Sequence, residues 1–197
     1  MSNNKKYSAI ILSAGKSSRM GVPKFSLRFN ANTTFLENII NQYLGFGCDE
    51  IIVVFNPDGV SFLKQLQLTF SPKVKIVINH HPEWERFYSL KLGAKGLNYI
   101  NHTFVSNIDN PFVNPKVLET LALSSEKVDY VYPTFNSRGG HPFLISDRII
   151  DDLNSEPKDE MHLKEFLGRY SKCAVEVDDD MVLANVNTDE EYRRLFV

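Results

Sequence analysis

The sequence predicts a three-layer α/β/α sandwich built around a mainly parallel sheet. Strand-length apolar runs alternate with helical patterns along the first half of the chain, and two of these runs, at residues 10–12 and 51–55, are apolar without interruption. Uninterrupted runs are typical of strands that are buried on both faces of a sheet. The 197 residues, 43% hydrophobic and 23% charged, contain no linker or repeat, so we expect a single domain over residues 1–197.

The elements are expected in βαβα order, which favours a parallel sheet covered by helices on both faces. The helical pattern is clearest in segment 85–97, where Phe87, Leu90, Ala94 and Leu97 recur at spacings of three and four. In the first half we expect strands at 7–12, 50–55, 74–78 and 103–105, the last continuing toward Asp109, and helices at 33–44, 59–68 and 85–97. In the second half we expect helices at 115–122, from about 146, at 161–170 and from about 189, and strands at 128–132, 142–145, 174–177 and 182–184.

Positive charge is concentrated at one end of a chain whose net charge is −2. Residues 1–36 hold six cations and no acid. A basic surface along the whole chain would suggest nucleic acid, whereas a patch at one end of a mildly acidic chain favours a small anionic ligand. For Lys5 and Lys6 a solvated basic arm is the better interpretation. The sequence therefore predicts no nucleic-acid partner.

The stretch SAGKSSRMGVPK, residues 13–24, follows the first predicted strand directly. Glycines at the carboxyl end of a strand let backbone N–H groups approach an anion, while Arg19 can bind phosphate oxygens in a forked geometry and Lys24 can supply a point charge. The spacing fits neither the G-x-x-x-x-G-K-[ST] loop nor the G-x-G-x-x-G fingerprint. These residues predict a binding site for a polyphosphate of a different type.

The segment AIILSAGKSSRMGVPK resembles the N-terminal signature L-A-A-G-x-S-x-R-M-G-x-P-K of the MobA-like NTP transferases, nucleotidyltransferases related to the molybdenum-cofactor guanylyl- and cytidylyltransferases. The resemblance implies a Rossmann-like fold of the GT-A, or nucleotide-diphospho-sugar transferase, type. It implies that the segment wraps the triphosphate of CTP or GTP and that Arg19 and Lys24 act on the phosphates in catalysis. The nucleotide-binding residues it implies here are Leu12, Ser13, Ala14, Gly15, Lys16, Ser17, Ser18, Arg19 and Lys24.

Two further matches follow in the family's order. Residues 79–97 resemble the family's N-P-x-W…S-L-x-x-G segment, which implies that Ser89 and Gly93 line the nucleoside pocket. NIDNPFV resembles the family's D-x-P-x-V, which makes Asp109 the catalytic magnesium ligand. Independently, a carboxylate at the end of an apolar strand lies where such sheets bind ligands, and oxygen ligands suit magnesium. The alternative is an Asx-turn or helix-cap aspartate before Pro111.

The segment RGGHPFLIS, residues 138–146, resembles the family's G-H-P segment on the acceptor side. The resemblance implies that Gly140, His141 and Pro142 contact the acceptor. For His141 a buried, hydrogen-bonded loop histidine is an equally good interpretation.

The segment LANVNTDEEYRRL, residues 183–195, resembles the family's terminal D-x-D-T-x-E-D-Y motif, but Asn185 and Asn187 replace both aspartates. An amide oxygen can ligate magnesium without adding charge, so Asn187 is the weaker candidate ligand and the metal would arrive with the nucleotide. Alternatively, Asn187 and Thr188 cap the last helix, with Glu190 three residues after Asn187.

Together these residues predict a Mg²⁺-dependent nucleotidyltransferase that moves an NMP group from CTP or GTP to a small phosphorylated acceptor and releases pyrophosphate. A molybdopterin-like cofactor and a sugar phosphate are the acceptors considered. A sugar-nucleotide-dependent glycosyltransferase and a non-catalytic nucleotide-binding regulatory protein are the alternatives. Two separated cysteines favour a reduced, cytoplasmic protein, and the short N-terminal apolar run favours one without a membrane partner. We expect a monomer or a homodimer.

Overall fold

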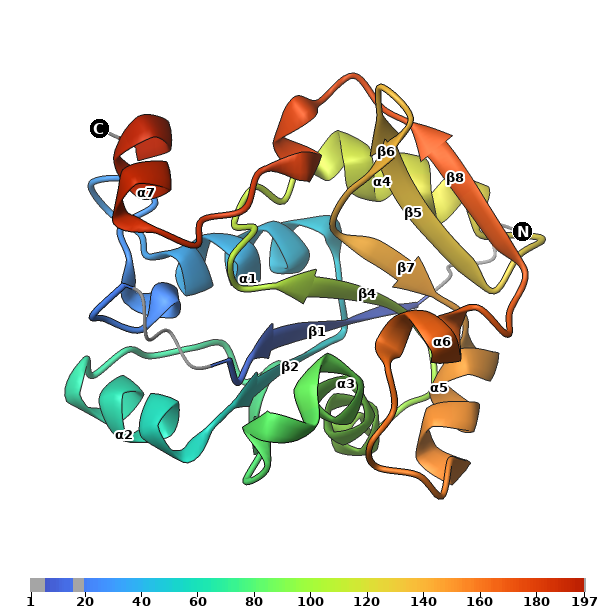
Figure 1. The fold of residues 1–197 in the computed structure, drawn as a ribbon, viewed down its shortest axis with the longest axis horizontal. Helices are drawn as coiled ribbons and strands as arrows, with labels where there is room; N and C mark the ends of the chain where they lie inside the picture. The colour runs from blue at the N-terminus through green and yellow to red at the C-terminus, as the bar shows by residue number, and fades with distance from the viewer. Residues whose placement is uncertain (1–5, 16–19, 197) are drawn as a thin grey trace.

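A computed structural model describes residues 6–15 and 20–196 and contains one mixed sheet with helices on both faces (Figure 1). The strands follow the order β3-β2-β1-β4-β7-β5-β6, and β8 also pairs with β5. Strands β1 to β4 are parallel to their neighbours among themselves, whereas β7 is antiparallel to both β4 and β5. The strands are β1 (Tyr7–Ser13), β2 (Glu50–Phe55), β3 (Val74–Ile78), β4 (His102–Asn107), β5 (Tyr130–Phe135), β6 (Arg138–Gly139), β7 (Phe143–Ile145) and β8 (Lys172–Glu176).

The helices form the two outer layers that the sequence predicts. One buried cluster joins the sheet to α1, α2 and α4, and a second joins its other face to α3, α5 and α6. In Figure 1, α1 and α4 are drawn above the central strands and α3 and α5 below them. The α-helices are α1 (Phe35–Phe46), α2 (Pro57–Gln65), α3 (Glu85–Gly96), α4 (Pro115–Ser124), α5 (Asp147–Ser155), α6 (Leu163–Leu167) and α7 (Asp189–Phe196). The 3-10 helices are η1 (Lys24–Ser26), η2 (Pro82–Trp84) and η3 (Asp180–Leu183).

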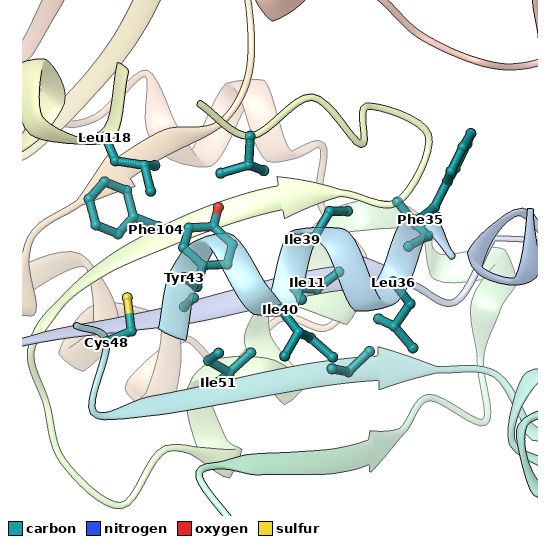
Figure 2. Close-up of a cluster of buried hydrophobic side chains, with 14 of the residues drawn as sticks. Ile11, Phe35, Leu36, Ile39, Ile40, Tyr43, Cys48, Ile51, Phe104 and Leu118 are labelled. Carbon is teal, nitrogen blue, oxygen red and sulfur yellow. The ribbon is translucent and has the colours of Figure 1, made fainter. Parts of the chain in front are cut away.

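The uninterrupted apolar runs are the two central strands β1 and β2. Side chains alternate between the faces of a strand, so Ile11 and Ile51 join the α1 cluster while Ile10 and Ile52 join the α3 cluster. Figure 2 shows the α1 side, where Ile39 and its neighbours on α1 pack onto the strands. Each such aliphatic side chain contributes about 1.5–3 kcal/mol when fully buried. The α/β/α fold class is therefore confirmed, with an antiparallel part around β7.

Three local expectations differ from the structure. Among the described residues, no strand forms at 182–184, and Val182 belongs to η3. The carbonyl of Val182 accepts hydrogen bonds from the Asn110 side chain and from the His141 N–H, so it is not available to pair with a neighbouring strand. The helix expected at 161–170 is only α6, of five residues. Helix α2 begins at Pro57, two residues early, because Asn56 caps it and proline suits the first helical turn. Among the described helices, none has the length and apolarity needed to cross a membrane.

Candidate active site

A cleft of about 500 Å³ opens at the carboxyl ends of β1 and β4. We call it the first cleft; it is lined by residues within 12–15, Lys24, residues within 82–89, residues 107–109 and His162. Parallel sheets bind ligands at this edge because the loops after neighbouring strands diverge there and leave a crevice. The fold thus brings the loop after β1 and the turn after β4 together, as the sequence predicts.

Most of the described residues predicted to bind nucleotide lie in the first cleft. Leu12, Ala14, Gly15, Lys24 and Ser89 all line it, as does Asp109, the predicted metal ligand. Lys16, Ser17, Ser18 and Arg19 lie outside the described residues. Ser13 belongs to the end of β1, and its buried side-chain oxygen has no hydrogen-bond partner in the described part of the chain.

Long-range hydrogen bonds hold the end of β1 and the first residue after it in place. The side-chain amide of Asn56 donates to the carbonyl of Ala14 at 3.0 Å, and the backbone N–H of Ile108 donates to the carbonyl of Leu12 at 3.1 Å. Gly21 has a φ of 67°, a left-handed conformation that favours glycine. Ala14 is therefore held by Asn56, the residue after β2, and Leu12 by the turn that carries Asp109.

Three polar side chains from distant parts of the chain meet beside the first cleft; Lys24 and Asp109 line it, and Asn187 contacts Lys24 from outside the lining. Lys24 donates a hydrogen bond from Nζ to Oδ1 of Asn187 at 2.8 Å, and the same Nζ lies 3.7 Å from Oδ2 of Asp109. The Lys24 side chain is only 12% exposed, so its attraction to Asp109 is less screened than that of a surface pair. Oxygen atoms of Asp109 and Asn187 thus face one positive charge.

The segment before α7 is held against the turn after β4. The backbone N–H of Val186 donates to the carbonyl of Asp109 at 2.7 Å, and the side-chain amide of Asn110 donates to the carbonyl of Val182 at 3.2 Å. These bonds place Asn187 beside Asp109 although the two residues are far apart in the sequence. Asn110, with 1% exposure, was not singled out from the sequence.

The cap of α7 differs from the one expected. Thr188 Oγ1 accepts a hydrogen bond from the backbone N–H of Glu191 at 3.2 Å. In return, a carboxylate oxygen of Glu191 accepts hydrogen bonds from the backbone N–H of Asn187 at 2.6 Å and from that of Thr188 at 3.1 Å. Hydrogen bonding from these N–H groups, that of Asn187 first, lowers the pKa of Glu191. The capping pair is therefore Thr188 and Glu191 instead of Asn187 and Glu190, which leaves the Asn187 side chain available to Lys24.

Ser89 is positioned by a buried asparagine that the sequence analysis missed. The side-chain amide of Asn79, which is fully buried, donates to Ser89 Oγ at 2.9 Å, and the hydroxyl donates to the carbonyl of Glu85 at 3.3 Å. Glu85 itself lines the cleft with φ 61° and ψ −160°, a conformation that is rare for any residue except glycine. Such backbone strain in a cleft is typical of functional sites.

Gly93 is not among the residues that line the first cleft. A Cβ atom at this position would lie 2.6 Å from Cγ2 of Ile10 and 3.3 Å from a methyl carbon of Val54. Glycine is therefore needed here so that α3 can pack closely on β1. The structure gives Gly93 a packing role, unlike the nucleoside contact that the resemblance implies.

A second cleft, also of about 500 Å³, lies beside the first and shares Arg86 and His162 with it. It extends over β5 and β7 beneath α6, and Gly140 and His141 line it. Pro142 is buried and is not among its lining residues. Two of the three residues predicted to contact the acceptor thus lie in a cleft continuous with the first.

His141 lies between the two clefts and is held as a neutral imidazole. Its Nε2 is 3.1 Å from the side-chain amide nitrogen of Asn107, which lines the first cleft. Burial lowers the pKa of His141 to about 4; the Asp109 carboxylate opposes this shift and the Arg86 guanidinium reinforces it. Near pH 7 the ring therefore accepts a hydrogen bond from Asn107 and carries no charge.

Asp109 and Asn187 offer the oxygen atoms that a divalent cation would need. Oδ1 of Asp109 is buried and lacks a hydrogen-bond partner within the described residues, which costs free energy unless a ligand pairs with it. Within the same residues, no group of three or more histidines, cysteines and acids could hold a metal alone. Magnesium is commonly held by one or two carboxylates together with substrate phosphates, so this pair fits an ion that binds with a nucleotide.

Comparisons with known proteins agree with this geometry. Residues 9–174 match the family model described as the MobA-like NTP transferase domain. A probable molybdenum cofactor guanylyltransferase of Bacillus cereus is 29% identical over 201 residues, which cover 95% of this chain and 94% of that protein.

Solved structures with lower identity share the fold. Rv0371c of Mycobacterium tuberculosis superimposes with a TM-score of 0.79 at 24% identity over 97% of this chain and 98% of its own. The same protein in complex with manganese gives a TM-score of 0.74 at 21% identity, covering 98% of each chain. The 4-diphosphocytidyl-2C-methyl-D-erythritol synthase of Anaerococcus prevotii gives 0.72 at 16% identity, over 97% of this chain and 96% of its own.

Proposed function

Since the chain belongs to the MobA-like NTP transferase domain family, we propose that it transfers a nucleoside monophosphate from CTP or GTP to a small phosphorylated acceptor and releases pyrophosphate. The observation that carries this proposal is that Lys24 and Asp109 line the first cleft, at the carboxyl ends of β1 and β4, and that Lys24 also binds Asn187. A partly buried cation beside a carboxylate with an unpaired oxygen suits a ligand that combines phosphates with a divalent cation.

In this proposal the donor nucleotide binds in the first cleft. The triphosphate lies along the segment after β1, where the backbone N–H groups near Gly15 and the Lys24 ammonium neutralise its charge. Arg19 is proposed to neutralise phosphate charge as well, because of its place in the motif. The nucleoside lies toward Ser89, whose hydroxyl is oriented by Asn79 and the carbonyl of Glu85. Among the described residues, Ser89 and Lys24 are already held by hydrogen bonds before the donor binds.

Transfer needs alignment and charge neutralisation more than acid–base chemistry. The acceptor phosphate is already ionised near pH 7, so it attacks the α-phosphorus without a general base, and pyrophosphate leaves from the opposite side. A magnesium ion held by Asp109 and Asn187 would supply Lewis-acid stabilisation of the phosphate oxygens. Neutral His141 and the Asn107 amide add no charge of their own at the boundary between the clefts and offer hydrogen-bonding groups there, near the Asp109 carboxylate.

The acceptor is proposed to enter from the second cleft, past Gly140 and His141. A molybdopterin-like cofactor is the first acceptor to test, because the Bacillus cereus relative is a probable molybdenum cofactor guanylyltransferase at 29% identity. The same name makes GTP the first donor to test, with CTP beside it. Sugar phosphates form the second group of acceptors.

The experiment is a pyrophosphate-release assay with GTP or CTP, magnesium and the acceptor panel. We compare the wild type with Asp109→Asn, which keeps the shape of the side chain and removes its charge, and with Asp178→Asn at an exposed position. Asp109→Asn is expected to lower turnover by about 10³-fold, since it removes the charged metal ligand, whereas Asp178→Asn is expected to match the wild type.

Three outcomes would contradict the proposal. Equal turnover by Asp109→Asn would remove this residue from the mechanism. Release of a nucleoside diphosphate from a sugar nucleotide, without pyrophosphate release from a triphosphate, would indicate a glycosyltransferase. Tight binding of GTP or CTP with no turnover across the panel would indicate a nucleotide-binding protein without catalysis.

A further inference from the structure

The second cleft carries only positive charge. Arg86, Lys164 and Lys172 line it, and the described residues around it include no aspartate or glutamate. In the described ranges neither lysine forms an ion pair with a carboxylate. Like charges gathered in one cleft repel each other, so an anionic ligand is favoured there.

The cations are spread along this cleft, with Arg86 toward one end, Lys172 toward the other, and Lys164 on α6. Arg86 also lines the first cleft, so it marks the near end, together with Gly140, whose N–H donates to the carbonyl of Pro133 at 2.8 Å. At the far end, Lys172 is in register with Tyr130. Pro133 lies three residue steps after Tyr130 on β5, a distance of about 10 Å along the strand. The cleft is therefore long enough to hold two anionic groups of one small molecule.

Aromatic rings form the surface between these ends. Tyr130 and Tyr132 are stacked with their ring centroids 5.2 Å apart, and the edge-to-face contact of Tyr130 with Phe143 at 5.3 Å fixes their position. Burial, with Tyr132 nearby, raises the pKa of Tyr130 to about 12, so its hydroxyl stays protonated and can donate to an anion. Flat apolar surface beside hydroxyl groups suits a planar or ring-shaped ligand.

We propose that the second cleft binds the body and remote end of the acceptor, and that this acceptor is an elongated, flat molecule with a second anionic group. Its reacting phosphate lies near Arg86, its flat part lies over Tyr130 and Tyr132, and its remote anionic group binds Lys164 and Lys172. The assignment of the reacting phosphate rests on the proposed nucleotidyl transfer. The binding of an elongated molecule with two anionic groups does not depend on that reaction.

The test measures binding of synthetic probes by titration calorimetry without any nucleotide. Biphenyl 4,4′-bisphosphate is compared with biphenyl 4-phosphate, which has the same flat part but lacks the remote charge. We expect the bisphosphate to bind the wild type about tenfold more tightly, since two charge-assisted contacts are added. A probe with a carboxylate in place of the second phosphate shows which kind of anionic group the lysines prefer. Tighter binding of either probe with two anionic groups than of the monophosphate supports the proposal.

Variants then locate this preference in the second cleft. The double variant Lys164→Gln/Lys172→Gln is expected to bind the bisphosphate and monophosphate equally well. Lys116→Gln, which changes an exposed lysine on α4, is expected to keep the tenfold ratio. A ratio near one in the wild type, or a ratio that survives in the double variant, would overturn the proposal.

The flat part is tested separately with Tyr132→Leu. This variant keeps apolar bulk but removes the ring, so it is expected to weaken both biphenyl compounds by about fivefold while leaving their ratio unchanged. Unchanged affinity would show that the ligand does not lie on the tyrosines. Because all these measurements omit nucleotide, their failure is distinct from a failure of pyrophosphate release in the Asp109 experiment.

Discussion

The two clefts share Arg86 and His162 but are built in different ways. The first lies where the parallel strands β1 and β4 end, and its polar groups sit in short segments directly after those strands. The second lies on the face of the antiparallel pair β5 and β7, and its lining residues are spread along β5, β7, α6 and β8. Strand ends can bind phosphate and metal in the same way for many substrates, whereas side chains on a sheet face can change without disturbing that chemistry. The difference suggests that the first cleft sets the reaction and the second sets the acceptor.

The largest expected effect separates the clefts directly. Lys24→Met removes the ammonium that contacts Asn187 and faces Asp109, so we expect GTP or CTP affinity to fall by about 100-fold to 1,000-fold, as the charge-assisted contacts with phosphate are lost. Titration calorimetry with magnesium present measures this loss. Lys116→Met, at an exposed position on α4 outside both clefts, is the matched control. Equal nucleotide affinity in Lys24→Met would show that the triphosphate does not bind here.

The next effect concerns the segment that joins the two clefts. A Cβ atom added at Gly140 would lie 2.5 Å from the carbonyl oxygen of Val182, and this backbone cannot move without shifting the segment that carries Asn187. Gly140→Ala is therefore expected to lower the free energy of unfolding by about 3 kcal/mol. Chemical denaturation measures the change.

Gly45→Ala supplies the matched control for Gly140→Ala. Gly45 lies in α1, and a Cβ there would have no atom within 4 Å. The substitution is expected to raise stability by about 0.5–1 kcal/mol, because alanine favours helix more than glycine does. If Gly140→Ala did not lower the free energy of unfolding relative to Gly45→Ala, the structure between the two clefts would not require the close packing of Gly140 on η3.

The first cleft could be predicted from the sequence far better than the second. Asp109 lies two residues after the end of β4, and the motif that ends at Lys24 begins at Ser13, the last residue of β1. Strand ends meet at one edge of a parallel sheet, so both segments are expected at that edge. Arg86 and His162 meet only through the docking of α6 against α3, for which no sequence spacing gives evidence.

Buried asparagines were the other gap in the sequence analysis. Asn79 and Asn110 orient Ser89 and Val182 through single long-range hydrogen bonds, and an asparagine in a loop has no pattern that distinguishes this role from a turn. A Cβ atom at Gly93 would lie too close to Ile10, so packing requires glycine there, and the nucleoside contact that its motif position implies stays a prediction.

A smaller effect tests the boundary between the clefts. Burial lowers the pKa of His141 from its usual 6.5 to about 4, so between these pH values the unfolded chain binds more protons than the folded one. The stability due to neutral His141 is fully present above about pH 6.5 and is lost as the pH falls toward 4. We expect His141→Gln to flatten the decline of unfolding free energy across this window by about 2 kcal/mol. Parallel wild-type and variant profiles in denaturant titrations would contradict a buried neutral ring.

The smallest expected effect tests whether the first cleft stores strain that the second lacks. Glu85 lines only the first cleft and holds φ 61° and ψ −160°, a conformation that costs a residue with a Cβ about 1–3 kcal/mol but is ordinary for glycine. Glu85→Gly is expected to raise the free energy of unfolding by about 1 kcal/mol, after the greater entropy of glycine in the unfolded chain offsets part of the relief. Glu85→Ala removes the same carboxylate but keeps the Cβ, so it should give no such gain. A gain of equal size in both variants, measured by denaturant unfolding, would show that the charge of Glu85 and not its backbone is the source of the cost.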